Sequence, residues 1–331
     1  MQDQTTQLPW EAPTWLDQTS AWINAQVAAC GWQSLSPVEI VRLRPWSAFA
    51  RVATTNGIVY FKATAPDCHY EAALTQALAR WRPYCTVPLL AVDLDCGWLL
   101  SADAGPTLHA ASPSTDQFEH WLKVLPLCVE LQLAMVDHLP ELLTFGLFDR
   151  RLTHLPHLYN QLMAGHENLR VGLEPGLTPE EYQRLQALQP WVTDACAQLA
   201  ELGLPETLVH EEVHSTNVLV NGDRYIFTDW SEAAITHPFF MMVVTLRGAA
   251  IEFGLDESGP VLRRLRDAYL EPWTAFATLE QLSNAFALAN RLAMVNRALS
   301  WHHGTGSLDQ RHKAPMPIAY PIGCATSWRR R

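Results

Sequence analysis

Residues 209–230 constrain the fold more than any other part of the sequence, because they place reactive side chains next to a β-hairpin. Two strand-like runs, residues 218–220 and 225–228, flank the turn Asn221-Gly222-Asp223, and Asn-Gly is a strong hairpin signal. Histidines and glutamates crowd the stretch before the hairpin, and Asp229 follows it directly. The sequence therefore predicts a loop rich in acids and imidazoles, a tight hairpin, and a second acid at its far end.

Phosphoryl transfer requires groups of these kinds in this order. An acid must orient the acceptor hydroxyl and take its proton, while an amide oxygen and a carboxylate hold the magnesium ions that bridge the nucleotide phosphates. Glu212, Asn217 and Asp229 occur in that order along the segment. We therefore predict that Glu212 is catalytic and that Asn217 and Asp229 bind magnesium.

A zinc-peptidase motif competes for the same residues. His210 and His214 enclose a His-Glu-x-x-His pattern, in which one helix places both imidazoles on the metal and Glu211 activates a bound water. Glu232 could supply a third ligand. The motif requires a helix that continues past His214, whereas strand-like residues and the Asn-Gly turn follow at once. A zinc metallopeptidase is therefore kept as a distant alternative.

The first hundred residues predict a small sheet with two helices. Apolar spacing in residues 14–29 predicts a helix within an N-terminal extension, residues 1–34. Spacing of Tyr70, Leu74 and Leu78 predicts a second, amphipathic helix. β-branched and aromatic runs predict antiparallel strands at residues 40–41, 49–53, 58–61, 89–92 and 98–100. The part from residue 35 to residue 102 is therefore expected to form a small α+β lobe.

Beyond Gly105 the pattern becomes mostly helical, apart from the hairpin. The expected helices lie near residues 115–139, 179–202, 239–253, 260–276 and 279–301. The predicted fold class is thus α+β, with a small antiparallel-sheet N-lobe that carries one main helix. A larger, mostly helical C-lobe, residues 103–331, would hold the catalytic loop and the metal-binding hairpin.

Residues 210–220 resemble the catalytic loop of the aminoglycoside phosphotransferase and choline kinase-like family, usually written His-Gly-Asp-x-His-x-x-Asn-x-Leu. The run Phe227-Thr228-Asp229-Trp230 is similar to that family's metal-binding Asp-Trp, and His237-Pro238-Phe239-Phe240 to the segment that commonly follows. The resemblance covers about residues 35–300. It implies a protein-kinase-like fold of two lobes and an ATP-dependent phosphotransferase that acts on a hydroxyl of a small molecule.

The resemblance also implies a nucleotide site in the small lobe, for ATP or GTP with Mg²⁺. Lys62 would contact the phosphates and be held by Glu71, as in kinase-like folds. Ser47, in the phosphate-covering loop of residues 44–48, would cap the phosphates together with nearby backbone amides. A hinge formed by Ser101, Ala102 and Asp103, continuing to Gly105, would pair with the nucleobase through its backbone. These are the cofactor-binding residues that we expect.

Two residues of the catalytic loop depart from the family's pattern, because Glu211 stands in place of Gly and Glu212 in place of Asp. Glutamate keeps the carboxylate but adds a methylene, and a displacement of about 1 Å can lower a rate by roughly a hundredfold. The loss of Gly is also expected to remove access to positive backbone angles. A nucleotide-binding pseudoenzyme with a regulatory role is therefore the main alternative function.

Charge and hydropathy exclude several classes of partner. The net charge is −11 and the only basic run is Arg329-Arg330-Arg331, so nucleic acid is not expected as a partner. No apolar run approaches the roughly 18 residues that span a bilayer, and we expect a soluble, cytoplasmic protein. Only residues 231–238 separate Asp229-Trp230 from the next predicted helix. This is too short for a protein-substrate platform, so we expect a small acceptor, which an acidic surface could favour as a cation.

Overall fold

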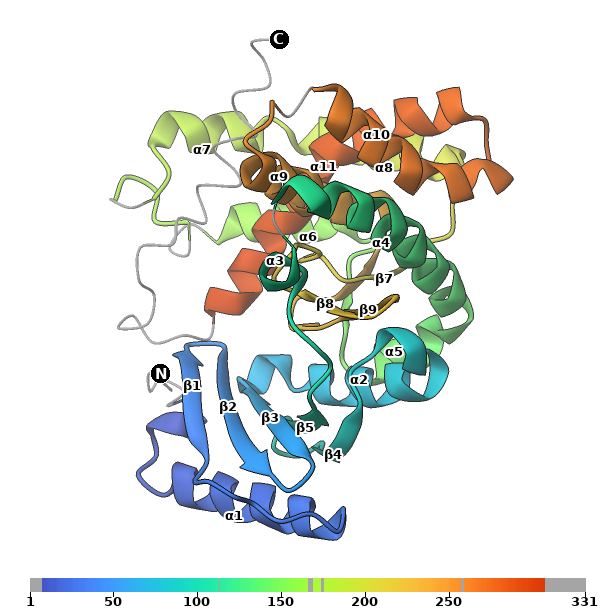
Figure 1. Cartoon of the computed structure of the whole chain (residues 1–331). Coiled ribbons are helices and arrows are strands. Elements are labelled where there is room, and N and C mark those ends of the chain that lie inside the picture. Colours follow the sequence, from blue (N-terminus) through green and yellow to red (C-terminus); the bar gives the residue numbers. More distant parts are fainter. Residues whose placement is uncertain (1–7, 113, 166–168, 174–175, 257–258, 307–331) are drawn as a thin grey trace. The chain divides into compact units, whose positions relative to one another are not determined.

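A computed structural model describes residues 8–112, 114–165, 169–173, 176–256 and 259–306 (Figure 1). The chain separates into two compact units, which are described in turn. Within the described ranges, no helix combines the length and the apolar character that crossing a membrane requires.

The first unit joins two stretches that are distant in sequence. It consists of the N-terminal part of the chain through Ala111 together with Thr216–Ser231, whereas the second unit contains Ser112–Ser215 and Glu232–Gly306. By its contacts the hairpin of residues 218–227 therefore belongs to the same unit as the N-terminal part of the chain. The boundaries expected from the sequence, after residues 34 and 102, follow chain order and stay a prediction.

A five-stranded antiparallel sheet forms the centre of the first unit, with strand order β1-β2-β3-β5-β4 (Figure 1). Its strands are β1 (Glu39–Arg44), β2 (Ser47–Thr54), β3 (Gly57–Thr64), β4 (Leu89–Asp93) and β5 (Trp98–Ala102). The expected Asn-Gly turn joins β2 to β3, where Gly57 has a φ of 104°, an angle that side chains disfavour. All five strands lie where the sequence predicted them, with longer bounds.

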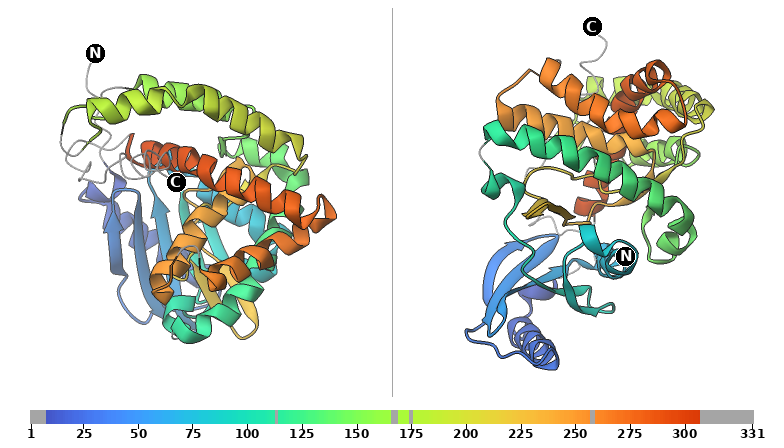
Figure 2. Two further views of the ribbon diagram at one scale, coloured as in Figure 1. Left: turned by 90° about the horizontal axis from the view of Figure 1, so that it is seen from above. Right: turned by 45° about the vertical axis from the view of Figure 1, so that its right-hand side comes forward.

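One face of this sheet is buried under the first helix, α1 (Trp15–Ala29), which runs along the sheet in Figures 1 and 2. Ile23 and Val27 are 1% exposed and pack with Ala50 and Phe61 of the sheet. Side chains on a strand alternate between two faces, so the residues between these core positions point to the other side of the sheet. That other side carries Lys62 and its neighbours.

The hairpin of β8 (Val218–Asn221) and β9 (Arg224–Phe227) is fixed to the chain just after the sheet. The Val220 amide donates to the Pro106 carbonyl at 2.9 Å. Gly105 has a φ of 99°, and a Cβ there would lie 2.4 Å from the Val220 carbonyl oxygen. Only glycine therefore allows this close approach.

The second unit is mostly helical and contains one short sheet (Figure 2). Its helices are α4 (Ser114–Met135), α5 (Leu139–Thr144), α6 (Leu155–Ala164), α7 (Pro179–Gln186), α8 (Gln189–Glu201), α9 (Met242–Phe253), α10 (Pro260–Leu270) and α11 (Leu279–Gly306). The sheet has the order β6-β10-β7, from β6 (Phe148–Asp149), β10 (Ala234–Thr236) and β7 (Thr207–Val209). The predicted α+β class with a mostly helical C-terminal part is confirmed.

Sequence reasoning placed some of these elements inexactly. The helix expected at residues 179–202 is two helices, because Pro190 lies in the first turn of α8, where its missing N–H is tolerated only at a helix start. The strands of the three-stranded sheet were not predicted, since β6, β7 and β10 have only two or three residues each. Such short strands carry little periodicity.

Candidate nucleotide site and catalytic loop

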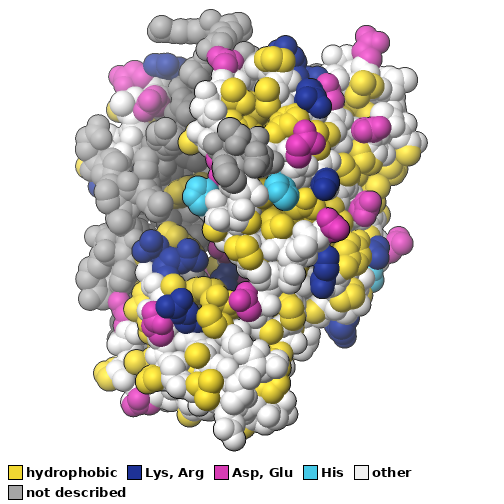
Figure 3. Space-filling model, in the orientation of Figure 1, with side chains coloured by type: hydrophobic (Ala, Val, Ile, Leu, Met, Phe, Trp, Pro, Cys, Tyr) yellow, Lys and Arg dark blue, Asp and Glu magenta, His cyan; other side chains and the backbone are white. Residues whose placement is uncertain are grey.

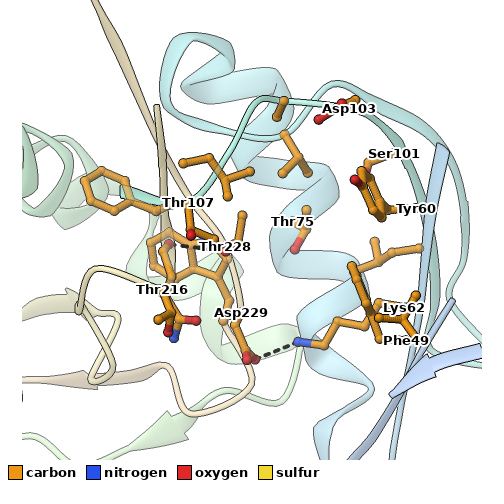
Figure 4. A pocket seen from close by; sticks show the side chains of 18 of the residues that line it. Phe49, Tyr60, Lys62, Thr75, Ser101, Asp103, Thr107, Thr216, Thr228 and Asp229 are labelled. Carbon is orange, nitrogen blue, oxygen red and sulfur yellow. Dashed lines mark hydrogen bonds and ion pairs between the residues drawn. The ribbon is translucent and has the colours of Figure 1, made fainter. Parts of the chain in front are cut away.

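Lys62 lies between two carboxylates of the first unit. Its Nζ is 2.7 Å from Glu71 Oε1 and 2.7 Å from Asp229 Oδ1. Lys62 comes from β3, Glu71 from the first turn of α2 (Tyr70–Trp81), and Asp229 from the segment after β9. Figure 4 shows Lys62 and Asp229 pointing toward one another. The fold thus brings together three side chains that the sequence singled out.

The electrostatics of this network keep Lys62 charged. Burial alone would lower the pKa of Lys62, but the charges of Asp229 and Glu71 outweigh it and raise the pKa above its ordinary value. Burial raises the pKa of Glu71, while Lys62 acts in the opposite direction. The Lys62 side chain is 14% exposed, and a largely buried ammonium group needs partners of opposite charge such as these two carboxylates.

Helix α2 also positions the backbone around Asp229. Glu71 Oε1 accepts a hydrogen bond from the Trp230 amide at 2.9 Å, and the Tyr70 hydroxyl donates to the Ser231 carbonyl at 2.5 Å. Asp229 itself has a φ of 66°, an uncommon angle for a residue other than Gly. Glu71 therefore binds both Lys62 and the segment that carries Asp229. The contact of Tyr70 with this segment was not predicted from the sequence.

Asn217 and Asp229 flank one hairpin and lie at its open end, because Val218 pairs with Phe227. The Asn217 carbonyl accepts hydrogen bonds from the Thr228 amide at 3.0 Å and the Thr228 hydroxyl at 3.2 Å. Both side chains line the same cavity. Amide and carboxylate oxygens are ligands that Mg²⁺ accepts, usually beside water and substrate phosphates. The donor set therefore fits magnesium held jointly with a nucleotide.

The cavity of the first unit has a volume of about 860 Å³, within the range of small-molecule sites. Lys62 and Asp229 lie at one end in Figure 4, with Tyr60, Ser101 and Asp103 further along. Phe49 and Tyr60 stack in its wall, with ring centroids 5.6 Å apart and planes 11° apart. The remaining residues expected at the nucleotide site, apart from Ser47, also line it: Glu71, Asn217, Ala102.

Two expectations about backbone and loop contacts differ from the structure. Ser47 is 3% exposed and is not among the described residues that line the cavity, because it starts β2 instead of standing in an open loop. The amides of Ala102 and Asp103 donate to the carbonyls of Pro88 and Ile58, at 2.9 Å and 3.1 Å. Hydrogen bonding with neighbouring strands therefore occupies two of the donors expected to face a nucleobase.

Glu212 lies in the second unit, on the loop after β7. Its carboxylate contacts one guanidinium group and one imidazole group. Arg297 of α11 approaches its Oε1 at 2.5 Å, and His214 Nε2 is 3.1 Å from its Oε2. Burial alone would raise the pKa of Glu212, but the hydrogen bond with His214 and the charge of Arg297 lower it below its ordinary value. The carboxylate therefore stays ionised.

Glu211 adopts the backbone angle that the family's glycine would provide. Its φ is 69°, so the expectation that replacing Gly removes access to positive angles is wrong. The side chain is 1% exposed and accepts hydrogen bonds from Asn296 and, at 3.4 Å, from Ser300. The buried Arg150 and Arg297 act against the rise in its pKa that burial causes. These contacts with α11 offset a strained backbone angle.

Arg297 also pairs with Glu232, at 2.7 Å, so it lies between two carboxylates as Lys62 does. Burial raises the pKa of Glu232 to about 7, although the charge of Arg297 lowers it. Sequence reasoning missed Arg297, Asn296 and Ser300 altogether. They stand on one long helix with no local motif, and only their spacing could have placed them on a shared face.

The zinc alternative lacks the structural element that it needs. Residues 210–214 are not helical, and the Glu212 amide donates to His210 Nδ1 at 3.3 Å. The loop conformation follows from the strands on either side, β7 and β8. Within the described ranges, no group of three His, Cys, Asp or Glu side chains could hold a metal ion.

Comparison with known proteins identifies the family. Residues 58–282 match the model of the phosphotransferase enzyme family, APH. This chain belongs to that family. Among curated proteins, none matches it significantly in sequence.

Solved structures of low sequence identity share the fold. The choline kinase LicA from Streptococcus pneumoniae has a TM-score of 0.61 at 13% identity, with 94% of this chain and 98% of that chain covered. The macrolide 2'-phosphotransferase MphH from Brachybacterium faecium has a TM-score of 0.57 at 16% identity, covering 91% and 97%. The aminoglycoside phosphotransferase APH(3'')-Id from Streptomyces rimosus, in complex with ADP and streptomycin, has a TM-score of 0.50 at 14% identity, covering 84% and 98%.

Proposed function

We propose that the protein transfers the γ-phosphoryl group of ATP or GTP, in the presence of Mg²⁺, to a hydroxyl group of a small molecule. The observation that carries the proposal is the Lys62 network with Glu71 and Asp229, in the wall of a cavity of about 860 Å³. A lysine held by a helix glutamate beside a metal-binding carboxylate is the arrangement that phosphoryl transfer uses. Membership of the phosphotransferase enzyme family supports it.

Each residue of the first unit has a defined task in this proposal. Lys62 donates to phosphate oxygens, and Glu71 fixes the direction of its ammonium group. Asn217 and Asp229 hold magnesium, which when bound neutralises charge on the phosphates. The Phe49–Tyr60 stack and the segment from Ser101 to Asp103 form the wall for the nucleoside.

Glu212 is the proposed general base. Its lowered pKa keeps it ionised at neutral pH, so it can accept a proton from the acceptor hydroxyl. The same shift makes it a weaker base than an unpaired glutamate. Arg297 and His214 hold the longer side chain in one place, which offsets the extra methylene relative to the family's aspartate.

The acceptor is proposed to be a small hydroxylated molecule. The segment after Asp229 reaches the 3-10 helix Pro238–Met241 within a few residues, leaving no long platform for a protein substrate. The structurally similar proteins include a choline kinase, a macrolide 2'-phosphotransferase and an aminoglycoside phosphotransferase in complex with streptomycin. An amine-containing acceptor is also consistent with the net charge of −11.

A nucleotide-binding pseudoenzyme is the second candidate function. One observation favours it: the carboxylate of Glu212 is bridged by Arg297 at 2.5 Å and by His214 at 3.1 Å. A base engaged in this way must exchange a partner when an acceptor hydroxyl arrives. A regulatory role would need only the nucleotide site of the first unit.

Phosphate transfer from γ-labelled ATP and GTP with magnesium tests the proposal. The acceptors are choline, ethanolamine, streptomycin and a macrolide, each analysed by mass spectrometry for a gain of one phosphate. Labelled product with any of them supports the phosphotransferase. Nucleotide binding without transfer to any acceptor, or to a wider set of hydroxylated metabolites, supports the pseudoenzyme. Absence of nucleotide binding contradicts both.

A further inference from the structure

The turn between β1 and β2 offers few backbone donors to a phosphate group. In kinase-like folds a glycine-rich loop covers the phosphates at this place. Residues 44–48 contain no glycine, and Pro45 has no backbone N–H. Ser47 is buried and the Trp46 carbonyl accepts from the Ala65 amide at 2.9 Å. The turn thus lacks the glycines of a glycine-rich loop and one of its amide donors, so side-chain donors beside the turn are the next groups to consider.

Two arginines of β1 stand beside this turn. Arg42 and Arg44 are exposed and line the cavity. Arg42 pairs with Phe49 on β2, and Phe49 pairs with Lys62 on β3, so the three side chains share one face of the sheet. Two strand spacings place the Cα atoms of Arg42 and Lys62 roughly 10 Å apart. Arg42 and Lys62 therefore extend from the same face of the sheet and line the same cavity.

The charges of these cations are compensated differently. Lys62 is paired with Glu71 and Asp229. Among the described residues, neither Arg42 nor Arg44 forms an ion pair with a carboxylate. The Arg42 guanidinium carbon lies 5.9 Å from the Phe49 ring centroid, and Arg44 Nη1 donates to the Leu43 carbonyl at 3.5 Å. Figure 3 shows Lys and Arg side chains at the end of the sheet where β1 and β2 meet.

We propose that Arg42, with Arg44 beside it, binds the phosphates of a nucleoside di- or triphosphate in place of the backbone amides of a glycine-rich loop. A guanidinium presents five N–H donors in a planar fork that matches phosphate oxygens bidentately. The ligand class follows from the donors, since a nucleoside without phosphates has no group for them. The inference rests on the nucleotide site proposed above, and assigns to β1 a role that its sequence alone did not suggest.

Calorimetric titration with magnesium present tests the role of Arg42. ATP, ADP and adenosine are titrated into the wild type, Arg42→Met, Arg42→Lys and the control Arg51→Met. Arg51 stands on β2, pairs with Glu39 at 2.8 Å and does not line the cavity as described. Arg42→Met should weaken ATP and ADP about tenfold, about 1.4 kcal/mol, and leave adenosine unchanged. Arg42→Lys should restore part of the affinity, and Arg51→Met should match the wild type.

Several outcomes overturn the assignment. Equal ATP affinity in the wild type and Arg42→Met would show that the guanidinium does not contact phosphate. An equal loss for ATP and adenosine would show that the substitution alters the cavity wall instead. A wild type that binds ATP while Arg42→Met is unaffected contradicts only this inference. A wild type that binds none of the three ligands contradicts the nucleotide site as well.

Discussion

In each unit a largely buried cation lies between two carboxylates, yet the two clusters differ in how far the sequence indicated them. In the first unit Lys62 lies between Glu71 and Asp229, three residues that sequence order predicted. In the second unit Arg297 lies between Glu212 and Glu232, and no motif indicated the arginine. The first cluster follows a pattern that can be recognised along the chain, whereas the partners of the loop of residues 210–217 depend on which helix packs against it.

The clusters also differ in how they compensate departures from a family pattern. The first keeps the expected residue types and adds bonds from Tyr70 and Glu71 to the segment carrying Asp229. The second replaces Gly-Asp by Glu211-Glu212, and α11 supplies partners for both acids. We infer that the first cluster acts on the nucleotide and the second on the proton of the acceptor.

The largest expected effect is on turnover. Glu212→Gln should lower turnover roughly 10²- to 10⁴-fold, because it removes a general base, and should leave the affinity for ATP nearly unchanged. Steady-state kinetics with the acceptor that gives the most product, together with calorimetry, measures both. The control is Glu201→Gln, an exposed residue of α8, which should behave as the wild type. Equal turnover in Glu212→Gln and the wild type would remove Glu212 from the chemistry.

Arg297→Met should destabilise the protein by about 3 kcal/mol, because it leaves two carboxylates without their shared partner. Urea unfolding measures the change, with Arg184→Met on the exposed part of α7 as the control. Arg297→Lys should lose less, since it keeps the charge. Arg297 contacts Glu212 through one guanidinium nitrogen and Glu232 through the other. In the lysine variant the acidic limb of the pH–rate profile should move to higher pH, because the pKa of Glu212 rises when this guanidinium is lost. An unchanged profile and stability would contradict the role of Arg297.

Glu211→Gly tests whether the contacts of α11 outweigh the strained backbone. Glycine relieves a left-handed angle that costs roughly 1–2 kcal/mol for other residues. It also leaves Asn296 and Arg150 without a buried carboxylate, which costs more. We expect a net loss of about 1 kcal/mol in the free energy of unfolding, measured by urea titration. If the glycine variant were more stable than the wild type, the contacts of Glu211 with α11 would not offset the cost of its left-handed backbone angle.

The smallest expected effect is a change in the pH dependence of stability. The pKa of Glu232 is raised from 4.5 to about 7, so between these pH values the folded state binds more protons than the unfolded state. The contribution of Glu232 is therefore full below pH 4.5 and is lost as the pH rises toward 7. The pKa of Glu212 is lowered, so Glu212 changes the stability only at pH values below its ordinary pKa, outside this window. Glu232→Gln should flatten the curve between pH 4.5 and 7, and an unaltered slope would contradict the assignment.

The sequence predicted most of the first unit because its signals are local. Asn56-Gly57 fixes a turn, alternation fixes the strands, and Lys62 and Glu71 stand at the spacing that joins β3 to α2. Asn217 and Asp229 were predicted for the same reason, because they flank a hairpin that has a local turn signal. Ser47 was expected in an open loop, whereas strand β2 begins at Ser47, two residues before the start that the side chains suggested.

The second unit was less predictable because its determining contacts are distant in sequence. Glu211 and Asn296 are 85 residues apart, and Arg150 and Ser300 are 150 apart. The φ of 69° at Glu211 is stabilised by those contacts and has no local signature. Membership of the family indicates the fold class, but the partners of the loop of residues 210–217 come from packing against α11.

The most direct test of the account is the magnesium dependence of nucleotide binding in the wild type, Asp229→Asn and Glu212→Gln. Unfolding is followed with and without ATP, each at several magnesium concentrations. In the wild type, ATP at a hundred times its dissociation constant should add about 2.7 kcal/mol to the free energy of unfolding. Glu212→Gln should keep this gain, and Asp229→Asn should lose its magnesium-dependent part. A gain that is absent from the wild type, or that depends on Glu212 and not on Asp229, would contradict the division of tasks between the two clusters.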